Sequence, residues 1–321
     1  MTGDRKKSWR GSFAIPMIPF DEKDRIDEDV LGAEIEYCVE CGVGGIPVPM
    51  MVSEYDVLSE AERRLVVEKT VEAADGRATV VANCTAPNRA TAMEYARFAS
   101  NQGADAVIAM VKPGRMADYE SIREYYAGIA EAAGGLPVFI QSHDFAPLSV
   151  DQLVRLCTEI ENVNWIKEEA TPAERRITEL LARNCPEIHG VMGGYGGIRL
   201  ITEWERGSSG LIHACDFCDV VQHIWELLDA GEQAEAEELF DRFLPTLVLL
   251  QMGGLEFSKR FMVKRGVFRS DRVRWRKKQF DAHDLREFDR VYERIQPYLR
   301  WPRIKKGGRP PAAQSQGSGA P

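Results

Sequence analysis

The sequence predicts an α/β fold, a (β/α)8 TIM barrel with a C-terminal helical appendage. Short apolar runs alternate with amphipathic helical segments from Gly11 to about Asp229, and eight such runs can be counted. This alternation is typical of βα units that build a parallel sheet. A doubly wound sheet is the competing architecture, but it usually has five or six strands and a glycine-rich turn after the first. The count of eight favours the barrel.

The expected strands are short runs of aliphatic and β-branched residues bounded by turn-forming residues. They cover residues 12–17, 44–48, 79–83, 106–110, 137–141, 163–167, 188–192 and 210–214.

The helices expected between these strands carry apolar residues at helical spacing, and several have start signals. Ser59 and Glu62 have the spacing of a capping box, and Asp27 and Ser149 are expected to cap their own helices. The helices cover residues 29–41, 60–74, 89–102, 119–133, 150–160, 173–184 and 198–206.

After Asp229 the sequence carries helical patterns only. We therefore divide the chain into a barrel over residues 1–229, a helical extension packed on the barrel over 230–304, and a tail over 305–321. The tail is rich in Gly, Pro, Ser and Ala without apolar periodicity, so we expect it to be disordered.

Composition excludes several classes of partner. The chain is 44% hydrophobic and 28% charged, with a net charge of −9, whereas nucleic acid and anionic membranes attract a basic face. No run approaches the ~20 apolar residues of a membrane span, and no apolar stretch follows the basic N-terminus as in a signal peptide. We expect a cytoplasmic protein that binds neither nucleic acid nor membrane.

The seven cysteines include two pairs with metal-like local spacing, Cys38 and Cys41 in "CVEC" and Cys215 and Cys218 in "CDFC". The first pair falls inside an expected helix, where cysteine behaves as a small apolar residue. Zinc ribbons usually separate their knuckles by only ~15 to 20 residues, and these pairs lie far apart. We predict no metal site and a reducing compartment.

Lys167 ends the sixth expected strand, in the stretch "NVNWIKEEATP". Chemistry in a (β/α)8 barrel gathers at the C-terminal ends of the strands. Alternation puts Lys167 on one face with Val163 and Trp165, pointing either into the barrel mouth or toward the helices. A neutral lysine amine, favoured by a partly apolar pocket, condenses with a ketone to form a Schiff base. The alternative is a structural ion pair with Glu168 or Glu169.

Five motifs carry a resemblance to a known family: "GSFAIPMIPFDEKDRID", "LSEAERR", "GADAVIAMVKP", "IKEEATP" and "RGSSGLIHA". Their order and spacing resemble the dihydrodipicolinate synthase / N-acetylneuraminate lyase family over roughly residues 9–299. The resemblance implies a Schiff-base aldolase, dehydratase or synthase on the barrel, commonly a homotetramer. It implies that Lys167 forms a covalent imine with a 2-oxo acid, that no cofactor is needed, and that the chain assembles as a homo-oligomer, a dimer or tetramer.

The sequence departs from the family at three places. The family's Gly-Thr-Thr-Gly-Glu motif aligns with "MMVSE", so Ser53 Oγ and backbone amides are expected to bind the substrate carboxylate. Glu54 is expected either to contact the substrate or to order the loop. The family's relay tyrosine after strand five aligns with Gln141, which can orient a group but not transfer a proton. The second family tyrosine aligns near Arg115.

Replacements for the missing relay are sought near the strand ends. His143, with an ordinary histidine pKa of ~6.5, is the candidate acid or base, and a solvent-facing loop histidine is the alternative. In "GGYGG", Gly193 and Gly194 let the backbone approach a ligand or simply form a tight turn.

Two further positions complete the expected site, and a third residue, His213, is considered beside them. Arg115 either neutralises an acidic substrate or is merely exposed, and Ile212 joins the substrate-binding set. His213 lines the mouth or is a hydrogen-bonded core histidine.

These departures make the synthase reaction doubtful. The combination of Gln141 with "IKEEA", "GGYGG" and "ERGSSG" resembles the 2-keto-3-deoxy sugar-acid dehydratases. We therefore expect a Schiff-base lyase that dehydrates such an acid through Lys167. A pyruvate-dependent aldolase or a dihydrodipicolinate synthase-like condensation is the first alternative. A catalytically silent barrel that binds a small acid is the second, and the retained lysine opposes it.

Overall fold

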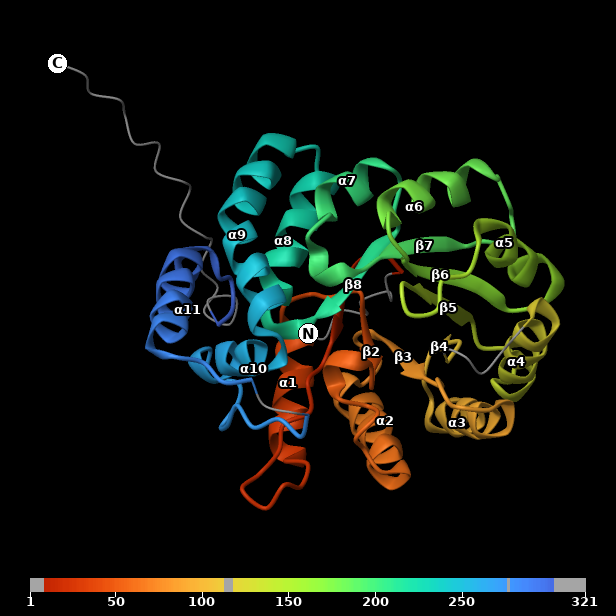
Figure 1. Ribbon diagram of the computed structural model, residues 1–321, viewed down its shortest axis with the longest axis horizontal. Coiled ribbons are helices and arrows are strands. Elements are labelled where there is room, and N and C mark those ends of the chain that lie inside the picture. The colour runs from red at the N-terminus through yellow and green to blue at the C-terminus, as the bar shows by residue number, and fades with distance from the viewer. Residues whose placement is uncertain (1–8, 113–117, 276–277, 303–321) are drawn as a thin grey trace.

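The computed structural model describes residues 9–112, 118–275 and 278–302. Within these residues eight parallel strands close into a barrel in sequence order, with helices around it (Figure 1). This confirms the predicted (β/α)8 barrel. The strands are β1 Gly11–Ile15, β2 Gly45–Val48, β3 Thr79–Asn83, β4 Ala106–Met110, β5 Val138–His143, β6 Val163–Glu169, β7 Gly190–Gly193 and β8 Gly210–Ala214.

The helices fill the expected intervals, and four 3-10 turns join them in the described residues. The α-helices are α1 Glu28–Glu40, α2 Glu60–Ala74, α3 Arg89–Gln102, α4 Tyr119–Ala132, α5 Val150–Glu159, α6 Ala173–Ala182, α7 Leu200–Glu205, α8 Cys218–Asp229, α9 Gln233–Gly253, α10 Leu255–Lys264 and α11 Ala282–Ile295. The 3-10 turns are η1 Met51–Ser53, η2 Tyr195–Gly197, η3 Cys215–Phe217 and η4 Gln296–Tyr298.

The helix starts follow the capping signals in the sequence. Ser59 accepts a hydrogen bond from the Glu62 amide while the Glu62 carboxylate accepts from the Ser59 amide, which is the capping box expected for α2. Ser149 and Gln152 form a second capping box at the start of α5, and Asp27 caps α1 by accepting a hydrogen bond from the Val30 amide. These local bonds fix where each helix begins.

Strand β6 extends two residues beyond Lys167, the residue at which the sequence predicted its end. The extension forms because β5 also runs on to His143, and the register pairs Gln141 with Lys167 and His143 with Glu169. Glu169 consequently lies in a strand rather than in a loop, on the same side of the sheet as Lys167.

The interior of the barrel is filled by large apolar side chains rather than by solvent. Trp165 stacks on Phe139, with ring centroids 5.3 Å apart, and on Trp9, with centroids 5.2 Å apart. Because Trp9 precedes β1, this stack closes the end of the barrel from which the strands start. Open space is left at their C-terminal ends.

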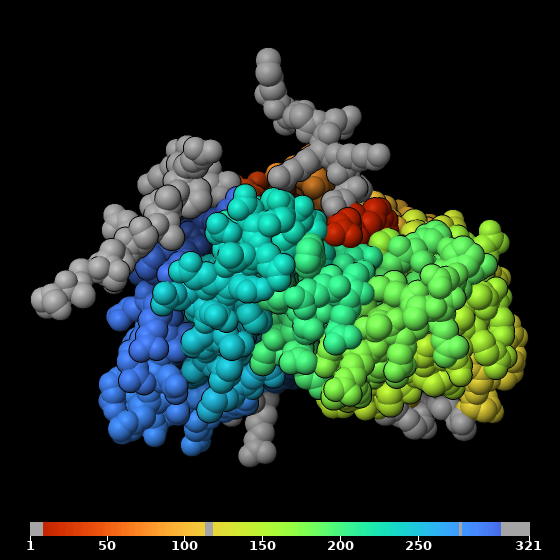
Figure 2. Space-filling model, turned by 90° about the horizontal axis from the view of Figure 1, so that it is seen from above, coloured from red at the N-terminus to blue at the C-terminus, as the bar shows by residue number. Residues whose placement is uncertain are grey.

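Helices α9, α10 and α11 lie together against one side of the barrel, next to α8 (Figures 1 and 2). Their shared core includes Phe217, Phe243, Phe261 and Phe288, so the barrel and these helices share one apolar cluster. The predicted tail over residues 305–321 lies outside the described residues. None of the helices in the described part of the chain is long and apolar enough to cross a membrane.

The cysteines are structural residues of the core. Six of the seven are buried, all seven are free thiols, and Cys185 alone is partly exposed. The two "CxxC" pairs, on α1 and at the start of α8, meet in one apolar cluster. Among residues 9–112, 118–275 and 278–302, no group of three or more His, Cys, Asp or Glu side chains is arranged to hold a metal ion.

Candidate active site

A cavity of about 340 Å³ lies at the C-terminal ends of the strands. Polar residues from β5, β6 and β8 line it on the barrel side, and apolar residues from α8, α9 and α10 line it on the other. The sequence-predicted residues that line it are Gln141, His143, Lys167 and Ile212. The strand ends therefore bring four of the nine expected site residues into one enclosure.

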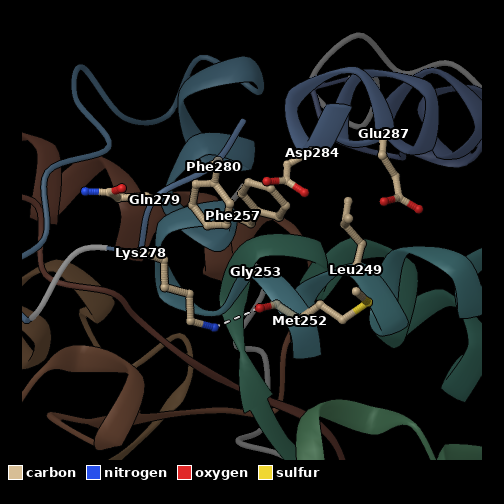
Figure 3. Close-up of a pocket in the computed structure, with 9 residues that line it drawn as sticks. All are labelled: Leu249, Met252, Gly253, Phe257, Lys278, Gln279, Phe280, Asp284 and Glu287. Carbon is tan, nitrogen blue, oxygen red and sulfur yellow. Dashed lines mark hydrogen bonds between the residues drawn. The ribbon is translucent and has the colours of Figure 1, made fainter. Parts of the chain in front are cut away.

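A second, larger hollow of about 850 Å³ lies between α9, α10 and α11 (Figure 3). Its one lysine, Lys278, donates a hydrogen bond to the Met252 carbonyl at 2.7 Å and so is engaged by the backbone. The hollow shares no lining residue with the Lys167 cavity. Although this hollow is the larger of the two, it is not the candidate active site, because Lys167 and the other polar residues at the strand ends line the smaller cavity.

Lys167 is buried at 3% exposure and points into the barrel mouth, where its ammonium meets Glu169. Lys167 Nζ lies 2.8 Å from Glu169 Oε2, and Gln141 Nε2 donates to the same oxygen at 2.8 Å. One carboxylate oxygen thus accepts from both an amine and an amide. The ion pair that the sequence left open forms with Glu169.

Glu168 has a different environment, because the next residue in a strand faces the other way. Its side chain points toward the helical layer, where Arg176 Nη2 lies 3.0 Å from Glu168 Oε2. Burial raises the pKa of Glu168, although the Arg176 guanidinium opposes the shift. Glu168 therefore connects α6 to the barrel through Arg176, whereas Glu169 lines the cavity beside Lys167.

Glu169 is held as a carboxylate despite being buried. Burial by itself raises its pKa, but the charge of Lys167 and hydrogen bonds from Lys167, Tyr195 N and Gln141 together lower the pKa below its usual value. The Tyr195 amide donates to Glu169 Oε1 at 3.1 Å. Glu169 is therefore ionised and fixed by three donors.

Gly193 and Gly194 leave room for two buried carboxyl side chains, a role that neither interpretation of the sequence predicted. A Cβ on Gly194 would lie 2.2 Å from Glu169 Oε1, and a Cβ on Gly193 would lie 1.8 Å from Glu203 Oε2. Both positions need glycine because two buried carboxyl groups approach the backbone there. The glycines thus position Glu169, and neither lines the cavity.

His143 lies at the end of β5 and lines the cavity. Its Nδ1 accepts a hydrogen bond from the Phe145 amide at 3.2 Å, so the ring offers an N–H at Nε2. The ring is parallel to Tyr195, with centroids 6.2 Å apart. The structure places His143 in the enclosure with Lys167.

Tyr195, from the "GGYGG" turn, is a tyrosine at the mouth that the sequence did not single out. Its hydroxyl donates to Asp144 Oδ2 at 2.7 Å, and this bond to a carboxylate raises the pKa of Tyr195. Thr171 also donates to Asp144 through its amide and hydroxyl, and these bonds lower the pKa of Asp144 to about 2. The hydrogen bond between Tyr195 and Asp144 connects η2 to the loop after β5.

Ser53 and Glu54 are engaged outside the cavity. Ser53 Oγ donates to the Pro16 carbonyl at 2.6 Å. Glu54 is fully buried, forms a 2.6 Å ion pair with Lys259, and accepts from the amides of Arg274 and Trp275. The structure does not bring either side chain to Lys167. Glu54 instead orders its loop, which is one of the two roles the sequence left open.

The remaining predicted residue, Arg115, lies outside the described residues. His213 lines the cavity and is also a core histidine, because Ser12 Oγ lies 2.7 Å from its Nε2. Burial lowers the pKa of His213 to about 4, and the nearby charge of Lys167 adds to this effect, so the imidazole is neutral.

Sequence reasoning missed the cavity roles of Glu169 and Asp216. Glu169 had a usable signal, since it lies two residues from Lys167 and so shares its face once the strand is extended. Asp216 lines the cavity from η3 and is 4% exposed. It follows a strand directly, which is the position where polar residues of a barrel gather.

Curated relatives are similar along most of the chain. The L-2-keto-3-deoxyarabonate dehydratase of Azospirillum brasilense is 24% identical over 309 residues, covering 94% of this chain and 99% of that protein. A 4-hydroxy-tetrahydrodipicolinate synthase of Mesorhizobium japonicum is 28% identical over 250 residues, covering 74% of this chain and 81% of that protein.

Solved structures share the fold. A dihydrodipicolinate synthase from Rhodopseudomonas palustris superposes with a TM-score of 0.82 at 25% identity, covering 89% of this chain and 97% of that one. A sialic acid aldolase from Ruminococcus gnavus, a variant of its catalytic lysine, gives a TM-score of 0.82 at 19% identity, covering 93% and 97%. The second likeness shows the fold alone.

The profile of the Dihydrodipicolinate synthetase family matches residues 8–274, which is most of the sequence. Members of this family are lyases that work through a Schiff base, and Lys167 stands in the cavity as such an enzyme requires. The chain is thus an enzyme of the class I aldolase type, and it belongs to the Dihydrodipicolinate synthetase family.

Proposed function

We propose that the protein is a 2-keto-3-deoxy sugar-acid dehydratase, a hydro-lyase that removes water from its substrate through an imine on Lys167. The observation that carries this proposal is the contact of Glu169 Oε2 with both Lys167 Nζ and Gln141 Nε2, at 2.8 Å each. It supplies a nucleophile and a base side by side without a relay tyrosine. The similarity to a dehydratase along nearly the whole chain supports the same choice.

In the proposed reaction Glu169 carries every proton. It takes a proton from the Lys167 ammonium, and the neutral amine then attacks the C2 ketone. Glu169 passes this proton, and then one from the attacking nitrogen, to the former carbonyl oxygen, which leaves as water as the protonated imine forms. It then takes a proton from C3 to give the enamine, which expels the C4 hydroxyl. That hydroxyl leaves as water with the proton taken from C3. Hydrolysis of the imine releases the product and restores the lysine.

Neighbouring groups are assigned positioning roles in the proposal. Gln141 fixes Glu169, and the Nε2–H of His143 donates a hydrogen bond to the leaving C4 hydroxyl while His143 keeps its proton. The substrate carboxylate lies against the backbone amides of Met51 and Val52, whose side chains offer no hydroxyl and which line the cavity. The covalent imine takes the place of a cofactor, and we propose a homo-oligomer, as the family resemblance implies.

Borohydride trapping tests the proposal. The protein is incubated with pyruvate or with L-2-keto-3-deoxyarabonate, reduced, digested and analysed by mass spectrometry. We expect an adduct on Lys167, loss of that adduct in Lys167→Met, and retention in Lys69→Met, a surface control.

Product analysis of the same reaction separates dehydration from aldol cleavage. Consumption of L-2-keto-3-deoxyarabonate without pyruvate release is the expected result. Pyruvate release would support the aldolase alternative instead, and no adduct with either acid would refute the Schiff base itself.

A further inference from the structure

The Lys167 cavity contains a second polar position that the proposed chemistry does not use. Asp216, in η3, and Ser258, in α10, both line the cavity and are 4% and 7% exposed. The two side chains are hydrogen-bonded to each other. They come from segments 42 residues apart in sequence, so the packing of α10 on the barrel creates this pair.

The Asp216 carboxyl group is not fully satisfied by the protein. Its Oδ2 atom is buried without a hydrogen-bond partner among the described residues. The Asp216 backbone is meanwhile fixed, because its carbonyl accepts from Tyr37 Oη at 3.3 Å and from Arg265 Nη1 at 3.1 Å. A buried acceptor that is held in place and left open needs an explanation, and a ligand hydroxyl is one.

The surroundings of the pair are apolar. Phe217, Val221, Leu247 and Leu255 line the same cavity from η3, α8, α9 and α10. Burial raises the pKa of Asp216 to about 6, against the hydrogen bond from Ser258 and the charge of Arg265, so the group is mainly ionised at neutral pH. A carboxylate in an apolar wall accepts hydrogen bonds from hydroxyls and repels another carboxylate.

We propose that Asp216 and Ser258 bind the terminal hydroxyl of the substrate and select monocarboxylic 2-keto-3-deoxy aldonic acids against dicarboxylic aldaric acids. The inference rests on the proposed function, since it places the other end of the same substrate on Lys167. The sugar-acid chain spans from the imine in β6 to η3, which follows β8. An aldaric acid would bring a second carboxylate against Asp216.

The test compares three probes on wild-type protein, Asp216→Asn and Ser258→Ala. Half-saturation of borohydride trapping is measured with pyruvate, which has no hydroxylated tail, with L-2-keto-3-deoxyarabonate, and with 2-keto-3-deoxyglucarate, a dicarboxylate. We expect Asp216→Asn to weaken capture of L-2-keto-3-deoxyarabonate about tenfold while capture of pyruvate stays unchanged, because a charged hydrogen bond is lost. Capture of 2-keto-3-deoxyglucarate should improve as the repulsion is removed.

Matched controls keep the outcomes distinct. Asp241→Asn, at an exposed position of α9, should change none of the three values. Equal loss with pyruvate and L-2-keto-3-deoxyarabonate would mean that Asp216 is only structural and would overturn the inference, as would no change with any probe. Failure of the wild-type protein to capture any of the three acids would overturn the proposed function, which is a separate result.

Discussion

Glu169 Oε2 lies 2.8 Å from Lys167 Nζ, and the two side chains are 8% and 4% exposed. A buried ion pair of this kind adds little to the free energy of unfolding, because the cost of removing both charges from water offsets much of their attraction. The same contact suits catalysis, since a nucleophilic amine must exchange protons with a neighbouring base. The contact is therefore best understood through what it does to a carbonyl substrate.

Glu169→Gln should separate catalysis from folding. Loss of the base should lower kcat by ~100-fold or more, while slow imine trapping on Lys167 persists. Glu168→Gln is the matched control, because that carboxyl faces Arg176 on the other side of β6. We expect the control to lower the urea midpoint and to keep kcat. A similar kcat loss in both variants would contradict the assignment.

Gly194→Ala should impair the site through Glu169. The added Cβ would lie 2.2 Å from Glu169 Oε1, so the carboxylate must shift away from Lys167 and kcat should fall. Gly32→Ala is the control, because a Cβ on this α1 residue meets no atom within 4 Å. The control should gain ~0.5 to 1 kcal/mol in free energy of unfolding, since alanine is the better helix former. Steady-state kinetics and urea titration measure both effects.

Glu203 should make the free energy of unfolding fall as pH rises. Burial raises its pKa to about 8, with the charge of Glu169 adding to the shift, while an unfolded glutamate titrates near ~4.3. The native state therefore holds a proton that the unfolded state has lost, and stability falls between these pKa values by at most ~1.4 kcal/mol per pH unit.

Glu203→Gln tests this pH dependence. The variant should lessen the slope of the unfolding free energy between pH 5 and pH 8, leaving the part that comes from Glu34, whose pKa burial also raises to about 8. It should be more stable than wild type at pH 8. Glu205→Gln, at an exposed position of the same helix, should leave the slope unchanged. A wild-type slope that survives in Glu203→Gln would show that another group is responsible. Urea midpoints across the pH range supply the comparison.

The Glu54–Lys259 pair should be necessary for folding. Both side chains are fully buried and their charged atoms lie 2.6 Å apart, so Lys259→Met leaves an uncompensated carboxylate in the core. We expect a loss of ~3 to 5 kcal/mol in free energy of unfolding. Lys69→Met removes a surface ion pair with Glu72 and should cost less than ~1 kcal/mol. Chemical denaturation of the two variants decides whether Glu54 serves the fold in this way.

Periodicity made the barrel and Lys167 predictable. Eight apolar runs identify eight strands, and alternation within the sixth puts Lys167 on one face with Val163 and Trp165. That this face points into the barrel mouth, and not toward the helices, is shown by the structure alone. Helix starts were predictable for a similar reason, because a capping box such as Ser59 and Glu62 is complete within four residues. Local patterns report local structure well.

Contacts between distant segments were not predictable from one sequence. Glu54 meets Lys259 across 205 positions and Ser12 meets His213 across 201, and no local pattern announces either pairing. For the same reason the position of Asp216 beside Ser258 was not predictable, because it depends on how α10 packs against the barrel. Glu169 is the intermediate case: its face follows from alternation, but only once β6 is known to extend to it.

The buried cysteines can report transient opening of the core through their reaction with thiol reagents. Thiol reagents attack the thiolate, and burial raises the pKa of both Cys84 and Cys157 to about 12, so the native state should protect them. Any labelling at these positions must pass through a transient opening of the surrounding core. The rate of modification at Cys38 on α1, compared with that at Cys157 on α5, would therefore show which part of the barrel opens first, with no introduced label.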